Sequence, residues 1–138
     1  MKKILLFLTL ALCFCSTIDA KKTWKRGEAE WAKIQLNDHL SYDQAFAMVL
    51  ELVTDKYEME MISKDGGYIR SAWNACRDKK GRKIKDQRYR VTIKFNHDHT
   101  QIQVKTECQH LKKGEWEDGE DSVLSRQLKD DVRGVLGY

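Results

Sequence analysis

The chain has 138 residues, of which 41% are hydrophobic and 33% are charged, and its net charge is only +4. That length fits one domain better than two, and this composition excludes a wholly disordered chain. The sequence contains no proline, which excludes a polyproline ligand, a proline-rich linker and a collagen-like segment.

Residues 1–20 have the layout of a secretory signal peptide. A basic start is followed by an apolar stretch from Ile4 to Cys15, and a more polar segment then ends at Ala20. The apolar stretch is too short to cross a bilayer as a helix, which takes about 20 residues. We therefore expect cleavage after Ala20, with Ser16 as the alternative position. Cleavage after Ala20 leaves a single exported domain over residues 21–138 in the periplasm or cell envelope.

Two cysteines of this leader offer an alternative, a lipid anchor at Cys13 or Cys15. Bacterial lipidation requires a small residue immediately before the cysteine. Leu12 and Phe14 stand there instead, so both positions match the lipidation pattern poorly.

The apolar pattern of the rest of the chain predicts the order strand, helix, four strands, helix. Residues 32–36 alternate between apolar and polar side chains, as a short strand does. A helix over 41–56 begins with Ser41 and Gln44, which form a capping box. The remaining elements are strands over 57–62, 68–76, 88–95 and 100–107, polar connections over 77–87 and 109–121, and a helix over about 122–136.

Consecutive strands joined by short turns form an antiparallel sheet. One face of this sheet is apolar, and only the two helices can cover it. We therefore expect an α+β fold, in which an antiparallel sheet of four to five strands packs on two helices.

Cys76 and Cys108 are the only cysteines that remain after the predicted cleavage. Two cysteines in an exported protein favour one disulfide between them, and the alternative is a pair of free thiols. If Ile69 and Trp73 face the core, Cys76 faces outward while Cys108 faces inward. A bridge then requires a β-bulge or a twisted strand end.

The stretch from Ser41 to Asn74 combines an amphipathic helix, a strand, and a glycine-containing turn followed by an aromatic residue. The residues concerned are Phe46, Val49 and Leu50 on the helix, Lys64-Asp65-Gly66-Gly67-Tyr68-Ile69-Arg70-Ser71-Ala72-Trp73 around the turn, and Arg88-Tyr89-Arg90-Val91-Thr92-Ile93 on a later strand. In this order the chain resembles the BamC-like helix-grip domains of small bacterial envelope lipoproteins, over about residues 32–108. The resemblance implies an envelope protein that works through its surfaces, and it transfers no catalytic residue.

The same order is also similar to the cystatin-like fold. Cystatin-type protease inhibitors use a Gln-x-Val-x-Gly hairpin and a Pro-Trp loop. Here the segment Gln101-Ile102-Gln103-Val104-Lys105 lacks the final glycine, and the chain lacks proline altogether. We therefore do not expect protease inhibition by that mechanism.

Two groups of basic side chains are candidates for binding. The outer-face cations lie on the solvent side of the predicted sheet and would receive a partner or an acidic ligand, although pairing with Glu58 and Glu60 also explains them. The loop cations would contact anionic lipid headgroups at a membrane surface, although a solvated hairpin loop also explains them. The outer-face cations are Arg70, Arg88, Arg90, Lys94 and Lys105, and the loop cations are Lys79, Lys80, Arg82, Lys83 and Lys85.

The other polar residues do not form a recognisable site. His97 and His99 occupy a predicted turn and His110 lies at the far end of the next strand, so three ligands cannot converge on a metal. The sequence has no nucleophile elbow, metalloprotease motif, P-loop or dinucleotide fingerprint. We therefore expect no enzyme activity, cofactor or metal, and export argues against nucleic acid as a partner.

Together these patterns predict an exported, non-enzymatic domain of the bacterial envelope that binds a protein partner or peptide through its surface. The alternative is a small-molecule or lipid-binding module with an apolar pocket between helix and sheet. A filled core beneath the 41–56 helix and an exposed cationic face would favour the first. A pocket of roughly several hundred Å³ beneath that helix would favour the second.

Overall fold

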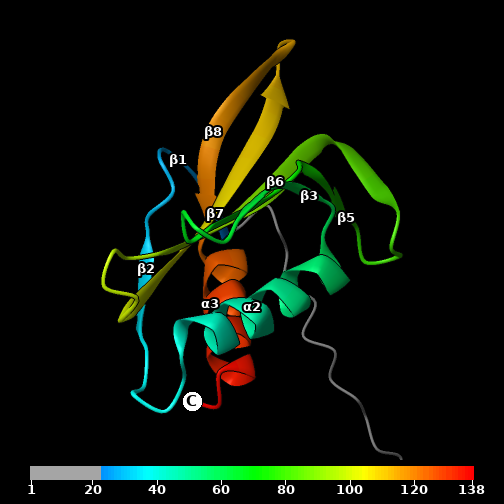
Figure 1. Cartoon of the computed structure of the whole chain (residues 1–138). Coiled ribbons are helices and arrows are strands. Elements are labelled where there is room, and N and C mark those ends of the chain that lie inside the picture. The colour runs from blue at the N-terminus through cyan, green and yellow to red at the C-terminus, as the bar shows by residue number, and fades with distance from the viewer. Residues whose placement is uncertain (1–22) are drawn as a thin grey trace, which may run out of the picture.

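The computed structural model describes residues 23–138, so the predicted signal peptide and the candidate lipidation cysteines lie outside the described part. An antiparallel sheet of eight strands carries two helices in an α+β fold (Figure 1). The fold class is as predicted, but the prediction of four to five strands is wrong.

The elements follow one another in the order strand, strand, helix, six strands, helix. Both predicted helices are confirmed, and the capping box is formed: the Ser41 hydroxyl accepts from the Gln44 amide, and the Gln44 side chain accepts from the Ser41 amide. The bounds are β1 (Trp24–Arg26), β2 (Ala32–Gln35), α2 (Tyr42–Lys56), β3 (Met59–Ser63), β4 (Tyr68–Ser71), β5 (Asn74–Arg77), β6 (Lys83–Phe95), β7 (Gln101–Lys112), β8 (Glu115–Asp121) and α3 (Ser122–Val135).

Two long strands, β6 and β7, form the centre of the sheet and pair with each other over nine residues each. Each also has two short partners, because β4 and β5 pair with β6 while β2 and β8 pair with β7. β3 lies beyond β4, and β1 lies beyond β8. Both helices lie on one face of the sheet (Figure 1), which we call the inner face, and the opposite face is the outer face.

Three strands are additional: β1 and β8 lie in segments whose polar composition does not predict a strand, and the predicted strand over 68–76 is divided into β4 and β5. β6 begins inside the predicted connection over 77–87, and β8 occupies part of the predicted connection over 109–121. The β7–β8 hairpin turns at Lys113 and Gly114, which both have positive φ. A two-residue turn of that kind matches the twist of the strands it joins, so the hairpin forms without an apolar pattern.

The predicted strand over 68–76 is interrupted between β4 and β5. At the break, the side-chain amide of Asn74 donates to the backbone carbonyl of Ala72 at 2.8 Å. The break reverses the predicted side-chain directions, so that Trp73 contacts Arg88 on the outer face and Cys76 faces inward beside Cys108.

The predicted disulfide is absent, because Cys76 and Cys108 are both free thiols. They face the same side of the sheet, but β6 runs between β5 and β7. Two strand spacings separate the backbones by about 10 Å, whereas a disulfide joins Cα atoms no more than about 7 Å apart. The intervening strand therefore prevents the bridge.

The hydrophobic core lies between the two helices and one half of the inner face. The side chains of Phe46, Val49 and Val53 on α2 are at most 3% exposed, so the space beneath α2 is filled. The core also contains Ile34, Leu36, Ala45, Ile69, Val91, Ile93, Phe95, Ile102, Val104, Leu128, Val132 and Leu136.

Candidate functional site

The outer face carries a connected group of indole and guanidinium groups. The Cζ atom of Arg88 lies 3.9 Å from the ring centre of Trp116 and 4.7 Å from that of Trp73. The Cζ atom of Arg90 lies 4.6 Å from the same Trp73 ring. We call these four residues the Trp–Arg stack, in which Arg88 contacts two indoles and Trp73 contacts two guanidinium groups.

Strand alternation and cross-strand register hold the two arginines in place. Arg88 and Arg90 flank the inward-facing Tyr89 on β6, so both point outward. The Arg88 Nε donates to the side-chain oxygen of Gln109 at 2.8 Å. Arg90 donates twice to the Glu107 carboxylate, at 2.8 and 3.3 Å. Both guanidinium groups are therefore fixed by rings on one side and by acceptors on the next strand.

The Arg90–Glu107 pair remains charged over a wide pH range. Burial raises the pKa of Glu107, but the hydrogen bond and charge of Arg90, together with Lys105, outweigh burial and hold this pKa below its usual value. The hydrogen bond that Arg90 donates to Glu107 raises the pKa of Arg90 in turn. Lys105 extends the group, because its Nζ lies 3.6 Å from Glu107 and 4.8 Å from the ring centre of Trp31.

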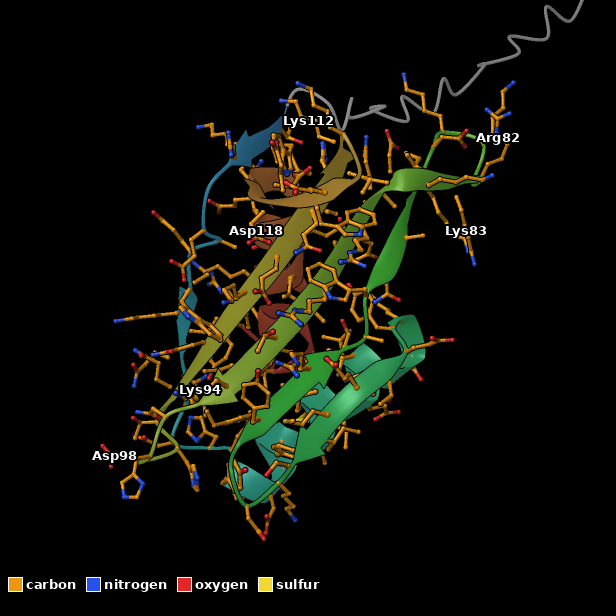
Figure 2. The ribbon with its side chains drawn as sticks, turned by 90° about the horizontal axis from the view of Figure 1, so that it is seen from above. Arg82, Lys83, Lys94, Asp98, Lys112 and Asp118 are labelled. Carbon is orange, nitrogen blue, oxygen red and sulfur yellow. The ribbon has the colours of Figure 1, made fainter. Side chains whose placement is uncertain are left out.

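All five outer-face cations lie on this face, as their register with neighbouring strands requires. Figure 2 looks onto it with the helices behind the strands, and Lys94 is labelled near one end of β6. The predicted pairing with acidic neighbours is present at Arg70, whose Nε lies 2.9 Å from Glu60. The sequence predicts that Trp73 faces the core and that Trp116 lies in a connection. Both predictions are wrong, because both indoles contact Arg88 on the outer face and Trp116 belongs to β8.

The loop cations occupy the β5–β6 hairpin, where Lys83 and Lys85 belong to β6 and the others to the turn. Asp78 holds this turn, because its carboxylate accepts from the backbone amides of Lys80 and Arg82 at 2.8 and 2.9 Å and pairs with the Arg82 side chain at 2.7 Å. Figure 2 shows Arg82 and Lys83 at a projecting corner, far from Lys94. The loop cations are therefore separate from the Trp–Arg stack.

The histidines stack on aromatic rings at opposite ends of β7. The ring centre of His99 lies 3.7 Å from that of Tyr42, and that of His110 lies 4.2 Å from that of Trp24. Among residues 23–138, no group of three or more His, Cys, Asp or Glu side chains is placed to hold a metal ion.

The inner face is hollowed beside α3. Two cavities of about 340 and 310 Å³ lie between this helix and the sheet. They share Tyr89, Leu124 and Gln127 as lining residues, so we treat them as one inner groove. The inner groove lies at the C-terminal end of α2, where Lys56 and Tyr57 line it, and outside the filled space beneath that helix.

Comparison with known proteins gives no assignment. No protein-family model matches the chain, and no curated protein is significantly similar to it. The part of the chain that the structure describes has no helix both long and apolar enough to cross a membrane.

Proposed function

We propose that this chain is an exported, non-enzymatic domain of the bacterial cell envelope that binds a protein partner or peptide through the outer face of its sheet. The observation that carries the proposal is the Trp–Arg stack. Tryptophan and arginine are the residue types that most often dominate the binding energy of protein interfaces. Both helices lie on the other face (Figure 1), so neither of them covers the stack.

The rigidity of the stack supports a binding role. Association costs free energy whenever a long side chain must be ordered at the interface. Here Arg88 is already held by two indoles and Gln109, and Arg90 by Trp73 and Glu107. A partner would therefore meet an ordered surface and would lose little affinity to side-chain entropy.

The charge of the face supports an acidic partner. Glu60, Glu107 and Asp118 offset part of the positive charge of this face, but they are fewer than the five outer-face cations. This excess favours a partner segment with acidic side chains, because complementary charge accelerates encounter and fixes register. Trp31, which is 38% exposed, adds an apolar contact beside Lys105.

Export and an envelope location rest on the signal-peptide pattern of residues 1–20 and on the resemblance to BamC-like helix-grip domains. The order of α2, a strand and the Gly66–Gly67 turn is consistent with that resemblance. The absence of a Pro-Trp loop keeps protease inhibition of the cystatin type outside the proposal.

Site-specific photo-crosslinking in cells tests the proposal. A photoreactive amino acid at Trp31 on the outer face should capture a discrete protein partner, whereas the same residue at Glu51, exposed on α2, should not. Arg88→Glu should abolish the crosslink from position 31 while the circular dichroism spectrum stays unchanged. No adduct at position 31, or equal adducts at both positions, would contradict binding through this face.

A further inference from the structure

The inner groove contains two buried polar groups that lack hydrogen-bond partners. The side chain of Thr106 on β7 is 1% exposed, and its hydroxyl has no partner within the described residues. The indole N–H of Trp24 is also buried and unpartnered there. One of these groups lines each cavity. Buried polar groups are nearly always hydrogen-bonded, so the Thr106 hydroxyl points to a ligand that supplies the missing partner, whereas the N–H edge of Trp24 packs against Gly119.

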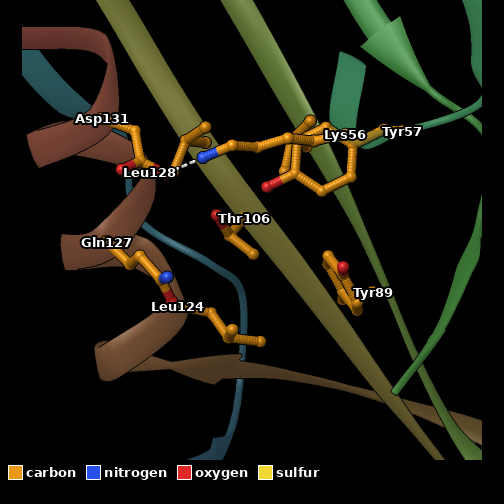
Figure 3. A pocket seen from close by; sticks show the side chains of 9 residues that line it. Lys56, Tyr57, Tyr89, Thr106, Leu124, Gln127, Leu128 and Asp131 are labelled. Atoms are coloured by element: carbon orange, nitrogen blue, oxygen red, sulfur yellow. Dashed lines mark hydrogen bonds and ion pairs between the residues drawn. The ribbon is translucent and has the colours of Figure 1, made fainter. Parts of the chain in front are cut away.

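The cavity nearer to α2 forms a polar end. Tyr57 and Thr106 both line it, and their hydroxyls are directed toward the same region in the view of Figure 3. The Lys56 Nζ lies 2.7 Å from the Asp131 carboxylate at its edge, so the charge of this lysine is already neutralised. Burial raises the pKa of Tyr57, which keeps the phenol protonated. This end therefore presents hydroxyl groups without a net charge.

The second cavity forms a more apolar end. Trp24 closes it by lying directly over Gly119, where a Cβ atom would come within 2.2 Å of the indole. Tyr89 and Leu124 line the passage between the two ends. Val123 lines the second cavity beside Trp24.

The ionisable groups of this second cavity are either held neutral or already engaged in hydrogen bonds within the protein. Burial raises the pKa of Cys76 to about 11 and that of Cys108 to about 12, and it lowers the pKa of His110. The Asp121 carboxylate accepts from the first amides of α3. Arg77 donates to the carbonyl of Gly81 in the hairpin turn. Asp121 and Arg77 keep their charges, but these hydrogen bonds direct the carboxylate to the start of α3 and the guanidinium to the hairpin turn.

From this arrangement we infer that the inner groove binds an uncharged single-chain lipid of the monoacylglycerol class. Its glycerol hydroxyls would lie between Tyr57 and Thr106, and its acyl chain would pass Tyr89 and Leu124 toward Trp24. The combined cavities fall within the range of about 300–1,000 Å³ that small-molecule sites occupy. The groove lies on the face opposite the Trp–Arg stack, so this inference stands independently of the proposed function.

Calorimetric titration of the folded protein with monolaurin, below the concentration at which this lipid forms micelles, tests the inference. We expect saturable binding at one site, and binding of laurate at least about tenfold weaker, because the only cation at the polar end, Lys56, is already paired with Asp131. Leu124→Trp fills the passage and should weaken monolaurin binding at least about tenfold. Absence of binding, or laurate binding as tightly as monolaurin, would overturn the assignment.

The matched pair Thr106→Val and Thr54→Val separates a direct contact from an effect on folding. Both variants replace a hydroxyl with a methyl group, but Thr54 is exposed on α2 and bonds only its own helix. Thr106→Val should weaken monolaurin binding by about 3- to 10-fold, and Thr54→Val should leave it unchanged. If Leu124→Trp does not fold, this isosteric pair decides the matter, and equal affinities in both variants would refute the site.

Discussion

Two neighbouring residues of β7, Thr106 and Glu107, lie on opposite faces of the sheet and have opposite surroundings. Glu107 accepts two hydrogen bonds from Arg90 on the outer face, whereas the buried hydroxyl of Thr106 on the inner face has no partner among residues 23–138. The outer face is charged, and the guanidinium groups of Arg88 and Arg90 already have acceptors, so these groups are ready to meet a partner as they stand. In the inner groove the unpartnered hydroxyl of Thr106 lies at a cavity, so a ligand that enters and hydrogen-bonds to it stabilises the folded state.

The largest expected difference between the faces concerns chemical reactivity in the inner groove. Cys76 and Cys108 should react with iodoacetamide at least about 100-fold more slowly in the native protein than in denatured protein. Only the thiolate reacts, and burial raises the two pKa values from 9.0 to about 11 and about 12. Peptide mapping by mass spectrometry measures each site.

The same experiment examines the separation of the two cysteines by β6. After denaturation without a reductant, both peptides should carry the alkyl group. Recovery of a peptide pair joined through Cys76 and Cys108 would contradict the arrangement of β5, β6 and β7.

On the outer face, Trp73→Ala should lower the free energy of unfolding by about 2 kcal/mol. The variant loses apolar burial and two cation–π contacts, each worth about 0.5–1 kcal/mol. Trp31→Ala is the control, because Trp31 is exposed and contacts one cation; its cost should stay below about 1 kcal/mol. Urea denaturation measures both, and equal losses would show that the stack does not hold the outer face together.

On the inner face, Thr106→Val should raise the free energy of unfolding by about 1 kcal/mol in the absence of ligand. The substitution keeps the shape of the side chain and removes a buried hydroxyl that has no partner. Thr54→Val, at an exposed position, should change stability by less than about 0.5 kcal/mol. A destabilised Thr106→Val would mean that the hydroxyl is already satisfied in the free protein.

The smallest expected effect is a pH dependence on the outer face. The pKa of Glu107 is lower in the folded protein than its unfolded value of about 4.3. Its stabilising contribution is therefore complete above that value and is lost as the pH falls through the folded pKa. Glu107→Gln should cost up to about 1 kcal/mol at pH 7 and progressively less toward pH 3 in chemical denaturation. A cost that does not change with pH would assign the effect to packing.

The helices and central strands could be predicted because burial on one face leaves a periodic trace. Tyr89, Val91, Ile93 and Phe95 alternate along β6, and the last three are at most 3% exposed. β8 leaves no such trace, because backbone pairing with β7 and the turn at Lys113 stabilise it without an apolar pattern. Composition alone therefore predicts a connection where the structure has β8.

The candidate sites could be predicted only in part, for a related reason. Alternation placed Arg88 and Arg90 outward, but the direction of Trp73 depends on a break that the Asn74 side chain stabilises through a local hydrogen bond. The number of cysteines likewise does not reveal that β6 runs between Cys76 and Cys108. Such features depend on strand order, which residue spacing does not encode.

The core covers only one half of the inner face, and this affects which parts of the sheet unfold locally. β6 is a continuous strand of 13 residues, but Val91, Ile93 and Phe95 belong to the core while Lys83 and Lys85 lie exposed near the hairpin turn. Amide hydrogen exchange follows local opening as well as global unfolding. The two halves of this strand should therefore belong to different cooperative units, so that the β5–β6 hairpin opens and closes many times within one lifetime of the folded core.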